Sequence, residues 1–286
     1  MSEAALRTSV ITALSADGKF GISSVARESV IKAMRIFTLG NSIYYMSISI
    51  VTTTRGRPGC FALLERWVAR QTVQPVQWLV VGEDHQGYRF TMGQEIIKRK
   101  SKKDTLPSIC ENWLAAIPHL KGDRILVMED DDYYHEEYIA TLAPLLDDAR
   151  LAGVKGDLYY KLPIRKYQMM GNQQHASLAA TVFTSEMIPF IERCRLHKSV
   201  YIDCYLWSEG TADNADWRLI PNKAKDGRAL HVGMKMMPGA NGLGMGHQDT
   251  GASDKSLAML TTWIGAADTR LYRSIPQDAK ADWMPS

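Results

Sequence analysis

The chain has 286 residues, of which 45% are hydrophobic and 23% are charged, and its formal net charge is +3. These values are ordinary for a globular protein and exclude a disordered or fibrous chain. No apolar run reaches the roughly 18 residues of a membrane span, and residues 1–20 lack the order of a secretory signal, so we expect a cytoplasmic protein. The four scattered cysteines, without a CxxC pair, indicate reduced thiols.

The chain divides into three parts by pattern. Residues 1–45 have weak helical periodicity and are expected to form a peripheral extension, residues 46–272 a single catalytic domain, and residues 273–286 a loosely packed tail. Within the domain, apolar runs and amphipathic segments alternate in the order strand 47–52, helix 60–71, strand 77–82, helix 107–120 and strand 123–128. This alternation predicts an α/β fold with a mostly parallel, Rossmann-like sheet flanked by helices.

The second half of the chain has weaker patterns. We expect a helix over 138–149, short strands near 157–162 and 179–184, and a helix over 186–195. From Gly227 onward the chain is rich in glycine and methionine, which predicts loops that close over a site.

Polar groups follow three of the expected strands, at residues 53–58, 83–85 and 129–132. In open α/β sheets, ligands bind beyond the carboxyl ends of the strands, so these segments are expected to converge on one site. The last of them, Glu-Asp-Asp-Asp, places four carboxylates side by side, and a divalent cation is the obvious compensation for their repulsion. Oxygen ligands favour Mg²⁺ or Mn²⁺. The alternative is a solvated acidic turn at the start of a helix.

Two segments resemble family 2 glycosyltransferases, which have the GT-A fold. They are Ser-Ile-Ser-Ile-Val-Thr-Thr-Thr-Arg-Gly-Arg-Pro at 47–58 and Gly-Asp-Arg-Ile-Leu-Val-Met-Glu-Asp-Asp-Asp-Tyr-Tyr-His at 122–135. The resemblance extends over about residues 46–148 and continues more faintly to residue 247. It implies a metal-dependent enzyme that moves a sugar from a nucleotide-sugar donor, with a UDP-sugar favoured, to a hydroxyl acceptor.

The resemblance also assigns residues. It places Asp131 and Asp132 near the metal and assigns the nucleotide base to Thr53, Thr54, Arg57 and one of Glu83 or Asp84. Glu129 and Asp130 are our further candidates for the nucleotide sugar. The segment Gly-Glu-Asp-His at 82–85 departs from the family's Asp-Asp-Gly-Ser and leaves the base open. Independently of the family, a leaving diphosphate requires cations, and the run at 98–103 supplies them, with Lys102 as our candidate. A solvated loop is the alternative for this run.

Three further residues lie later in the chain. The segment Tyr-Ile-Asp-Cys-Tyr-Leu-Trp at 201–207 is similar to the family's region that carries the catalytic base, which makes Asp203 the candidate base of an inverting transfer. His231 and His247 are candidates to complete the metal shell, since imidazole is a common metal ligand. A structural role in packing or pairing is the alternative for all three.

Two other classes of protein fit part of the pattern. A nucleotidyltransferase acting on a sugar phosphate would also need clustered carboxylates, but the turn at 52–58 has only one glycine. A non-enzymatic nucleic-acid-binding protein would use the basic run at 98–103. For the enzyme, the acceptor is left open between a polysaccharide, a lipid-linked or protein acceptor, and a hydroxymethylated base in phage-type DNA.

Overall fold

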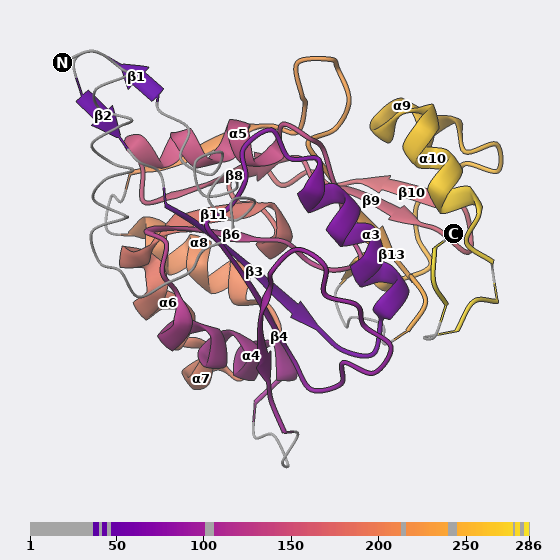
Figure 1. Cartoon of the computed structure of the whole chain (residues 1–286). Coiled ribbons are helices and arrows are strands. Elements are labelled where there is room, and N and C mark those ends of the chain that lie inside the picture. The colour runs from indigo at the N-terminus through magenta and orange to yellow at the C-terminus, as the bar shows by residue number, and fades with distance from the viewer. Residues whose placement is uncertain are drawn as a thin grey trace, which may run out of the picture.

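The protein is described here by a computed structural model, which covers residues 37–39, 42–44, 47–100, 106–212, 216–239, 245–276, 278–280 and 283–285. Most of the expected N-terminal extension lies outside these residues. Its described part is an antiparallel pair, β1 (Phe37–Leu39) and β2 (Ser42–Tyr44), at the upper left of Figure 1. Among the described residues, no helix has both the length and the hydrophobicity required to cross a membrane.

The centre of the molecule is a mixed seven-stranded sheet with the strand order β12-β8-β11-β6-β3-β4-β5. Strand β11 is antiparallel to both of its neighbours, and the other neighbouring pairs are parallel. The predicted α/β class with a mostly parallel sheet is therefore confirmed. The strands are β3 (Ile48–Thr54), β4 (Gln77–Gly82), β5 (Glu95–Lys98), β6 (Arg124–Val127), β8 (Leu151–Lys155), β11 (Thr181–Thr184) and β12 (Trp217–Pro221).

The connection of these strands creates a switch point beside β3. The chain runs outward from β3 to β4 and β5 and then returns to β6 on the other side of β3. Val51 in β3 is consequently paired with Leu79 in β4 and with Val127 in β6, and all three are buried apolar residues. Ligands of open α/β sheets bind in the crevice that opens at such a point, beyond the carboxyl ends of the strands.

A second sheet has five strands in the order β14-β10-β9-β13-β7. It begins directly after the acidic run, because β7 (Tyr133–Tyr134) follows Asp132 and pairs with β13 (His231–Lys235). The other strands are β9 (Leu158–Lys161), β10 (Lys166–Met169) and β14 (Ala252–Ser253). The acidic run thus lies where the central sheet passes into the second one.

Helices cover the sheets and complete one hydrophobic core. Helix α3 (Pro58–Ala69) starts directly after β3 and buries Phe61, Leu64 and Val68, which a spacing of three and four residues places on one face. Figure 1 shows α9 and α10 near the strands of the second sheet. The other helices are α4 (Ser108–Ala116), α5 (Tyr138–Leu142), α6 (Ile188–Glu192), α7 (Cys194–His197), α8 (Ile202–Ala212), α9 (Ala258–Ile264) and α10 (Ala266–Arg273).

The last third of the chain differs from the expectation of loops. Besides β13, it holds α9 and α10, which meet at Gly265 with φ of +85°. Each of these helices is shorter than three turns, so neither gives a long periodic pattern in the sequence. In the tail, Trp283 packs against Gly59 at the start of α3.

Candidate active site

The acidic run follows β6 and forms a compact group of carboxylates. Asp130, Asp131 and Asp132 are buried, and Glu129 is half-buried. One carboxylate oxygen from each of Glu129, Asp131 and Asp132 lies within 4.8 Å of the others. Three oxygen donors at this separation are close enough to share one cation.

The end of β3 is bound directly to this run. Arg57 makes ion pairs of 2.5 Å with Asp130 and 2.7 Å with Asp131, and the Thr54 hydroxyl donates a hydrogen bond to Asp130. Because Thr54 donates to Asp130, the Tyr88 hydroxyl donates to Thr54 at 2.7 Å, and it accepts from the Arg57 backbone N–H at 2.7 Å. The predicted convergence of Thr54, Arg57 and the acidic run is therefore present in the structure.

Asp132 is anchored to β13 by both of its oxygens. One oxygen accepts from the Met234 N–H at 2.9 Å and from the Lys235 ammonium at 3.2 Å, and the other lies 3.0 Å from His231 Nε2. Lys235 also lies over the ring of Tyr159, 5.2 Å from its centroid. These contacts fix one carboxylate of the run and bring a buried cation next to the others.

Lys235 is a residue of the candidate site that sequence reasoning missed. A signal for it exists: residues two apart on a strand share a face, so once His231 is placed at the site, Lys235 in the same strand points the same way. Gly246 leaves room for it, because a Cβ there would lie 3.2 Å from the Lys235 side chain. The strand sequence His-Val-Gly-Met-Lys does not by itself indicate that its lysine is buried at a site.

Burial sets the protonation of the run. Burial, with the charges of Asp132 and Asp131, raises the pKa of Glu129 to about 8, and burial raises the pKa of Asp130 to about 6 although Arg57 opposes the rise. For Asp132 burial acts in the same direction, but Lys235 and His231 outweigh it and hold the pKa at about 2. With all four carboxylates ionised, as they would be around a bound divalent cation, Arg57 and Lys235 would leave two negative charges, which that cation would balance.

The donor set fits Mg²⁺ or Mn²⁺. Among the described residues, the Glu129 carboxylate makes no hydrogen bond or ion pair, and Asp131 uses one of its two oxygens, for Arg57. Asp132 is already engaged on both oxygens. Hard oxygen ligands suit these ions. The residues with free lone pairs are thus Glu129, which sequence reasoning had given to the nucleotide sugar, and Asp131.

The two candidate histidines lie beside the run. His231 is fully buried against Asp132, and its Nδ1 has no hydrogen-bond partner within the described part of the chain. His247 is half-buried, and burial together with Lys235 lowers its pKa, which keeps the imidazole neutral near pH 7. The His247 Nδ1 is likewise buried without a partner among those residues. Neither ring nitrogen is part of the carboxylate group described above.

The remaining candidates for the nucleotide lie around the ends of β3 and β4. Glu83 is paired with Arg99 at 2.5 Å, and Arg99 also donates to Asn112 at 2.7 Å. Asp84 is exposed, and its Oδ1 accepts from the Gln86 N–H. Thr53 is half-buried near the end of β3. Lys102 lies outside the described residues.

Asp203 lies in the first turn of α8, separate from the acidic run. Burial raises its pKa, and the nearby Asp157 adds to the rise while His175 opposes it. Burial raises the pKa of the Tyr159 hydroxyl, and the charges of Asp157, Asp132 and Asp203 add to the rise although Lys235 opposes it. A half-buried carboxylate with a raised pKa suits proton abstraction.

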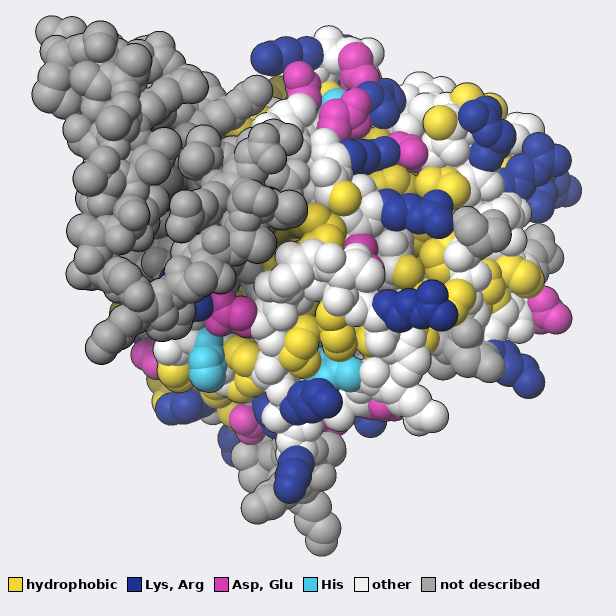
Figure 2. Space-filling model, viewed as in Figure 1, with side chains coloured by type: hydrophobic (Ala, Val, Ile, Leu, Met, Phe, Trp, Pro, Cys, Tyr) yellow, Lys and Arg dark blue, Asp and Glu magenta, His cyan; other side chains and the backbone are white. Residues whose placement is uncertain are grey.

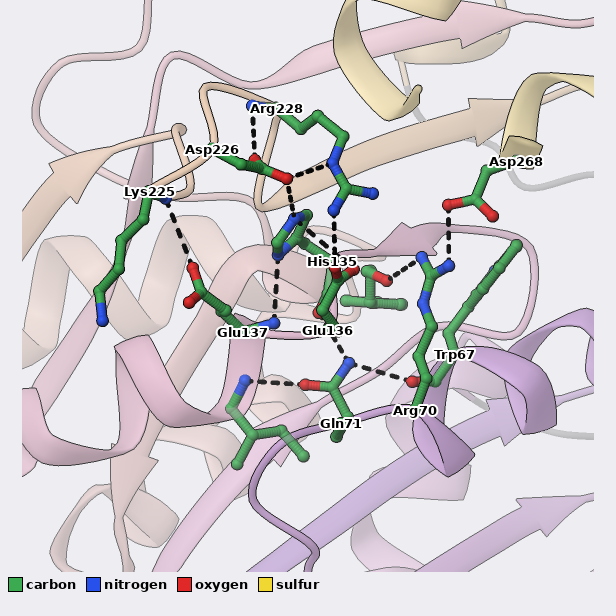
Figure 3. A network of polar contacts seen from close by, with 12 residues as sticks. Trp67, Arg70, Gln71, His135, Glu136, Glu137, Lys225, Asp226, Arg228 and Asp268 are labelled. Carbon is green, nitrogen blue, oxygen red and sulfur yellow. Dashed lines mark hydrogen bonds and ion pairs between the residues drawn. The ribbon is translucent and has the colours of Figure 1, made fainter. Parts of the chain in front are cut away.

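A second polar group includes residues that follow the run in the chain and is shown in Figure 3. His135, Glu136 and Asp226 also bring ligand atoms within 4.8 Å of one another. Arg228 occupies this group, with ion pairs of 2.6 Å to Glu136 and 2.5 Å to Asp226. His135 Nδ1 accepts from the Glu137 N–H at 3.1 Å, and its Nε2 faces Asp226 at 3.3 Å.

This network connects the chain after the acidic run to three other segments. Gln71 at the end of α3 donates to the His135 carbonyl at 2.7 Å, and the His135 N–H donates to the carbonyl of Leu230, just before β13. Arg70 joins the Tyr134 carbonyl at 3.0 Å to Asp268 of α10 at 2.8 Å. The network therefore fixes β7, which directly follows Asp132, and β13, which carries the residues that hold Asp132.

No family model matches the sequence, and no curated protein matches it. Among solved structures, the chain is similar to TarS residues 1–349 of S. aureus, with 14% identity and a TM-score of 0.48 over 66% of this chain and 60% of that one. It is also similar to the mannosyltransferase PcManGT of Pyrobaculum calidifontis in complex with GDP-Man and Mn²⁺, with 10% identity, a TM-score of 0.41, and coverage of 63% and 56%.

A third similar structure is glucosyl-3-phosphoglycerate synthase from Mycobacterium tuberculosis in complex with Mn²⁺, UDP and phosphoglyceric acid, with 9% identity, a TM-score of 0.40, and coverage of 62% and 68%. The chain thus spans less than two thirds of the first two structures. The sequence identity of the chain with these three structures is 9–14%.

Proposed function

We propose that the protein is a metal-dependent glycosyltransferase that moves a sugar from a nucleotide-sugar donor to a hydroxyl acceptor. The observation that carries the proposal is the group of Glu129, Asp131 and Asp132 oxygens within 4.8 Å at the switch point of the sheet. Bound there, Mg²⁺ or Mn²⁺ would neutralise the diphosphate that leaves the donor. Glu129 and Asp131 would hold it, and Asp132 would be kept in place by Lys235 and His231.

The chain's own groups would bind and orient the donor. The nucleotide would lie over the ends of β3 and β4, where Thr53, Glu83 and Asp84 offer polar groups around the base and ribose. Arg57 and Lys235 place two cations beside the carboxylates, and their charge would stabilise the developing diphosphate. The donor nucleotide we favour is UDP.

Asp203 would act on the acceptor. As the acceptor oxygen bonds to the anomeric carbon, the bond from that carbon to the diphosphate breaks, and the hydroxyl proton passes to the Asp203 carboxylate. Asp203→Asn removes the base without changing its size. We expect kcat to fall by about 10²-fold or more while donor affinity is retained, because the donor groups lie elsewhere. A normal kcat would assign the base to another residue.

The acceptor is proposed as a carbohydrate hydroxyl. Across the face shown in Figure 2, Lys and Arg side chains are scattered among apolar and acidic ones. Nucleic acid is bound by basic side chains gathered along a groove or stripe, and that face of the described residues does not present one. A hydroxymethylated base in DNA remains the second acceptor to test, because it would present the same reacting group.

A donor screen tests the proposal directly. UDP-, GDP-, CMP- and TDP-sugars are each added with Mn²⁺, with Mg²⁺ or with EDTA, and the melting temperature is measured, since a ligand that binds only the folded state raises it. We expect a metal-dependent rise with one nucleotide, and release of that nucleotide when an acceptor polysaccharide is added. A rise with nucleoside triphosphates alone would favour a nucleotidyltransferase, and binding only to nucleic acid would favour a binding protein.

A further inference from the structure

A cavity of about 170 Å³ lies apart from the acidic run. It is bounded by the segments that leave β9 and β13 and by the end of α10. Its floor is apolar and buried, made by Leu162, Met237, Leu257, Tyr272 and Ile275. Arg165 and Arg273 stand at its wall with larger exposed surfaces. An engineered cavity of about 150 Å³ takes a benzene molecule, so this one accommodates a chemical group of similar size.

The walls of this cavity hold an unusual amount of strained backbone. The described residues include four non-glycine residues with positive φ, and three of them line the cavity: Arg165 at +48°, Met236 at +61° and Leu257 at +63°. A left-handed conformation costs roughly 1 kcal/mol or more for such residues and persists only where the surrounding structure imposes it. Asp254 contributes to this, since its N–H donates to the Arg165 carbonyl at 2.7 Å. The backbone of the cavity wall is therefore held in place by the surrounding structure.

The charged residues of the cavity wall, Arg165 and Arg273, favour an anionic ligand. Arg165 uses one nitrogen for the Lys255 carbonyl at 3.0 Å, and Arg273 makes no ion pair with any described residue. Among the described residues that line the cavity there is no Asp or Glu. Guanidinium groups bind phosphate and carboxylate through paired hydrogen bonds, and the apolar floor accepts a short carbon skeleton. The chemistry fits a phosphate monoester or a carboxylate on a small molecule.

One wall is shared with the candidate active site. Residues 236–239 directly follow Lys235, and Gly239 lies so close to Arg57 that a Cβ at this position would be 2.4 Å from the Arg57 Cγ. The Pro238 carbonyl accepts from the Cys60 thiol at 3.5 Å. Arg57 in turn holds Asp130 and Asp131. A ligand that displaced residues 236–239 would therefore also displace Arg57, which forms ion pairs with the acidic run.

We propose that this cavity is a second binding site, which takes a small anionic ligand and is coupled to the donor site through residues 236–239. The binding part of the proposal is independent of the enzyme's activity, and the coupling part rests on the proposed function. Two sources of such a ligand are distinguished by experiment: an acceptor that carries a phosphate or carboxylate is consumed, whereas an effector is not.

The binding test uses the full chain and three probes: inorganic phosphate, glycerol 3-phosphate and glycerate. We expect at least one of the two organic probes to bind at millimolar concentration or below by ligand-observed NMR, with tenfold or greater weakening in Arg273→Gln and Arg165→Gln. Arg270→Gln is the matched control, because Arg270 lies on the same helix but does not line the cavity. Unchanged binding in both cavity variants, or no binding of any probe, would overturn the site.

A second comparison separates this site from the donor site. Asp131→Asn should leave binding of the probe unchanged, whereas loss of binding in that variant would place the probe at the acidic run and overturn the proposal. Coupling is then measured as the change in UDP affinity when the cavity is saturated. A glycosylated probe in the mass spectrum identifies an acceptor, and a changed UDP affinity without consumption identifies an effector. A bound probe with neither result would contradict the coupling.

Discussion

The molecule contains two groups of acidic side chains with similar spacing and different chemistry. In the acidic run, three carboxylates lie within 4.8 Å of one another, and the same limit holds for His135, Glu136 and Asp226. Burial raises the pKa of Glu129 to about 8 in the first group. In the second, burial opposes the shift, but hydrogen bonds from Arg228 and His135 hold the pKa of Asp226 at about 2.

The difference shows that spacing alone does not define a metal site. In the second group, which is partly exposed, Arg228 forms ion pairs with both carboxylates. These ion pairs join the segment around Glu136 to the segment around Asp226. In the acidic run, Arg57 and Lys235 leave part of the charge uncompensated, and Glu129 keeps its lone pairs free. Buried charge without a partner is costly, and a cation is the ligand that relieves it.

The largest expected effect separates the two groups by activity. Asp131→Asn removes a charged oxygen donor from the acidic run, and we expect transfer to fall by about 10³-fold, because neutralisation of the leaving diphosphate is lost. Asp226→Asn, the matched change in the second group, should keep activity within about threefold of the wild type, a difference of less than 1 kcal/mol. Release of UDP under steady-state conditions measures both. Equal losses in the two variants would refute the distinction.

The next effect concerns stability. Lys235→Gln removes the cation from a buried pair, and breaking a buried pair from one side typically costs about 3–5 kcal/mol. Denaturant unfolding of the metal-free protein checks this value. Lys235→Met tests the cause, since it also removes the cation and should be at least as destabilising. A loss below about 1 kcal/mol would mean that Asp132 is held by His231 and the Met234 N–H alone.

A smaller effect appears as pH dependence with opposite signs. The pKa of Glu129 in the folded state, about 8, exceeds its ordinary value of 4.5, so between these two pH values the folded state keeps a proton that the unfolded chain releases. The free energy of unfolding therefore falls as the pH rises from 4.5 to about 8. Asp226 has a depressed pKa, so its contribution is present above pH 3.8 and is lost as pH falls toward about 2. Glu129→Gln should flatten the upper limb and Asp226→Asn the lower one in melting curves.

The smallest effect is expected from Arg228→Gln. Its two ion pairs are partly exposed, so we expect a loss of about 1 kcal/mol, which lowers the melting temperature by about 2–4 °C for a chain of this size. Arg193→Gln removes an exposed pair with Glu209 and serves as the control, with an effect below about 0.5 kcal/mol. A large loss of transfer activity in Arg228→Gln would show that these two ion pairs also position residues of the active site.

Sequence patterns predicted the strands that lead into the site, because a strand is recognised from residues that are adjacent in the chain. The apolar runs before Thr53 and Glu129 located β3 and β6, because buried parallel strands are continuous apolar segments. The strand at 181–184 was also expected, but an apolar run carries no direction, so its antiparallel pairing was not. Contacts across long separations, such as Asp132 with Lys235, form only in the folded chain.

The same limit applies to the two acidic groups. Glu136 and Asp226 are 90 residues apart in the chain, and nothing in the local sequence indicates that Arg228 joins them. For the acidic run, four adjacent carboxylates gave a clear signal, whereas the division of labour among them depends on which oxygens the fold already occupies. Both Asp132 oxygens are occupied by contacts with β13, whereas the Glu129 carboxylate has no hydrogen-bond partner among the described residues.

The most direct test of the account is a calorimetric titration of the metal-free protein with Mn²⁺ in the presence of UDP. The wild type and Asp226→Asn should bind one Mn²⁺ per chain with similar affinity. The double variant Glu129→Gln, Asp131→Asn should lose at least about 100-fold in affinity, equivalent to about 2.7 kcal/mol. Retention of Mn²⁺ binding in the double variant and its loss in Asp226→Asn would place the metal in the second group and contradict the account.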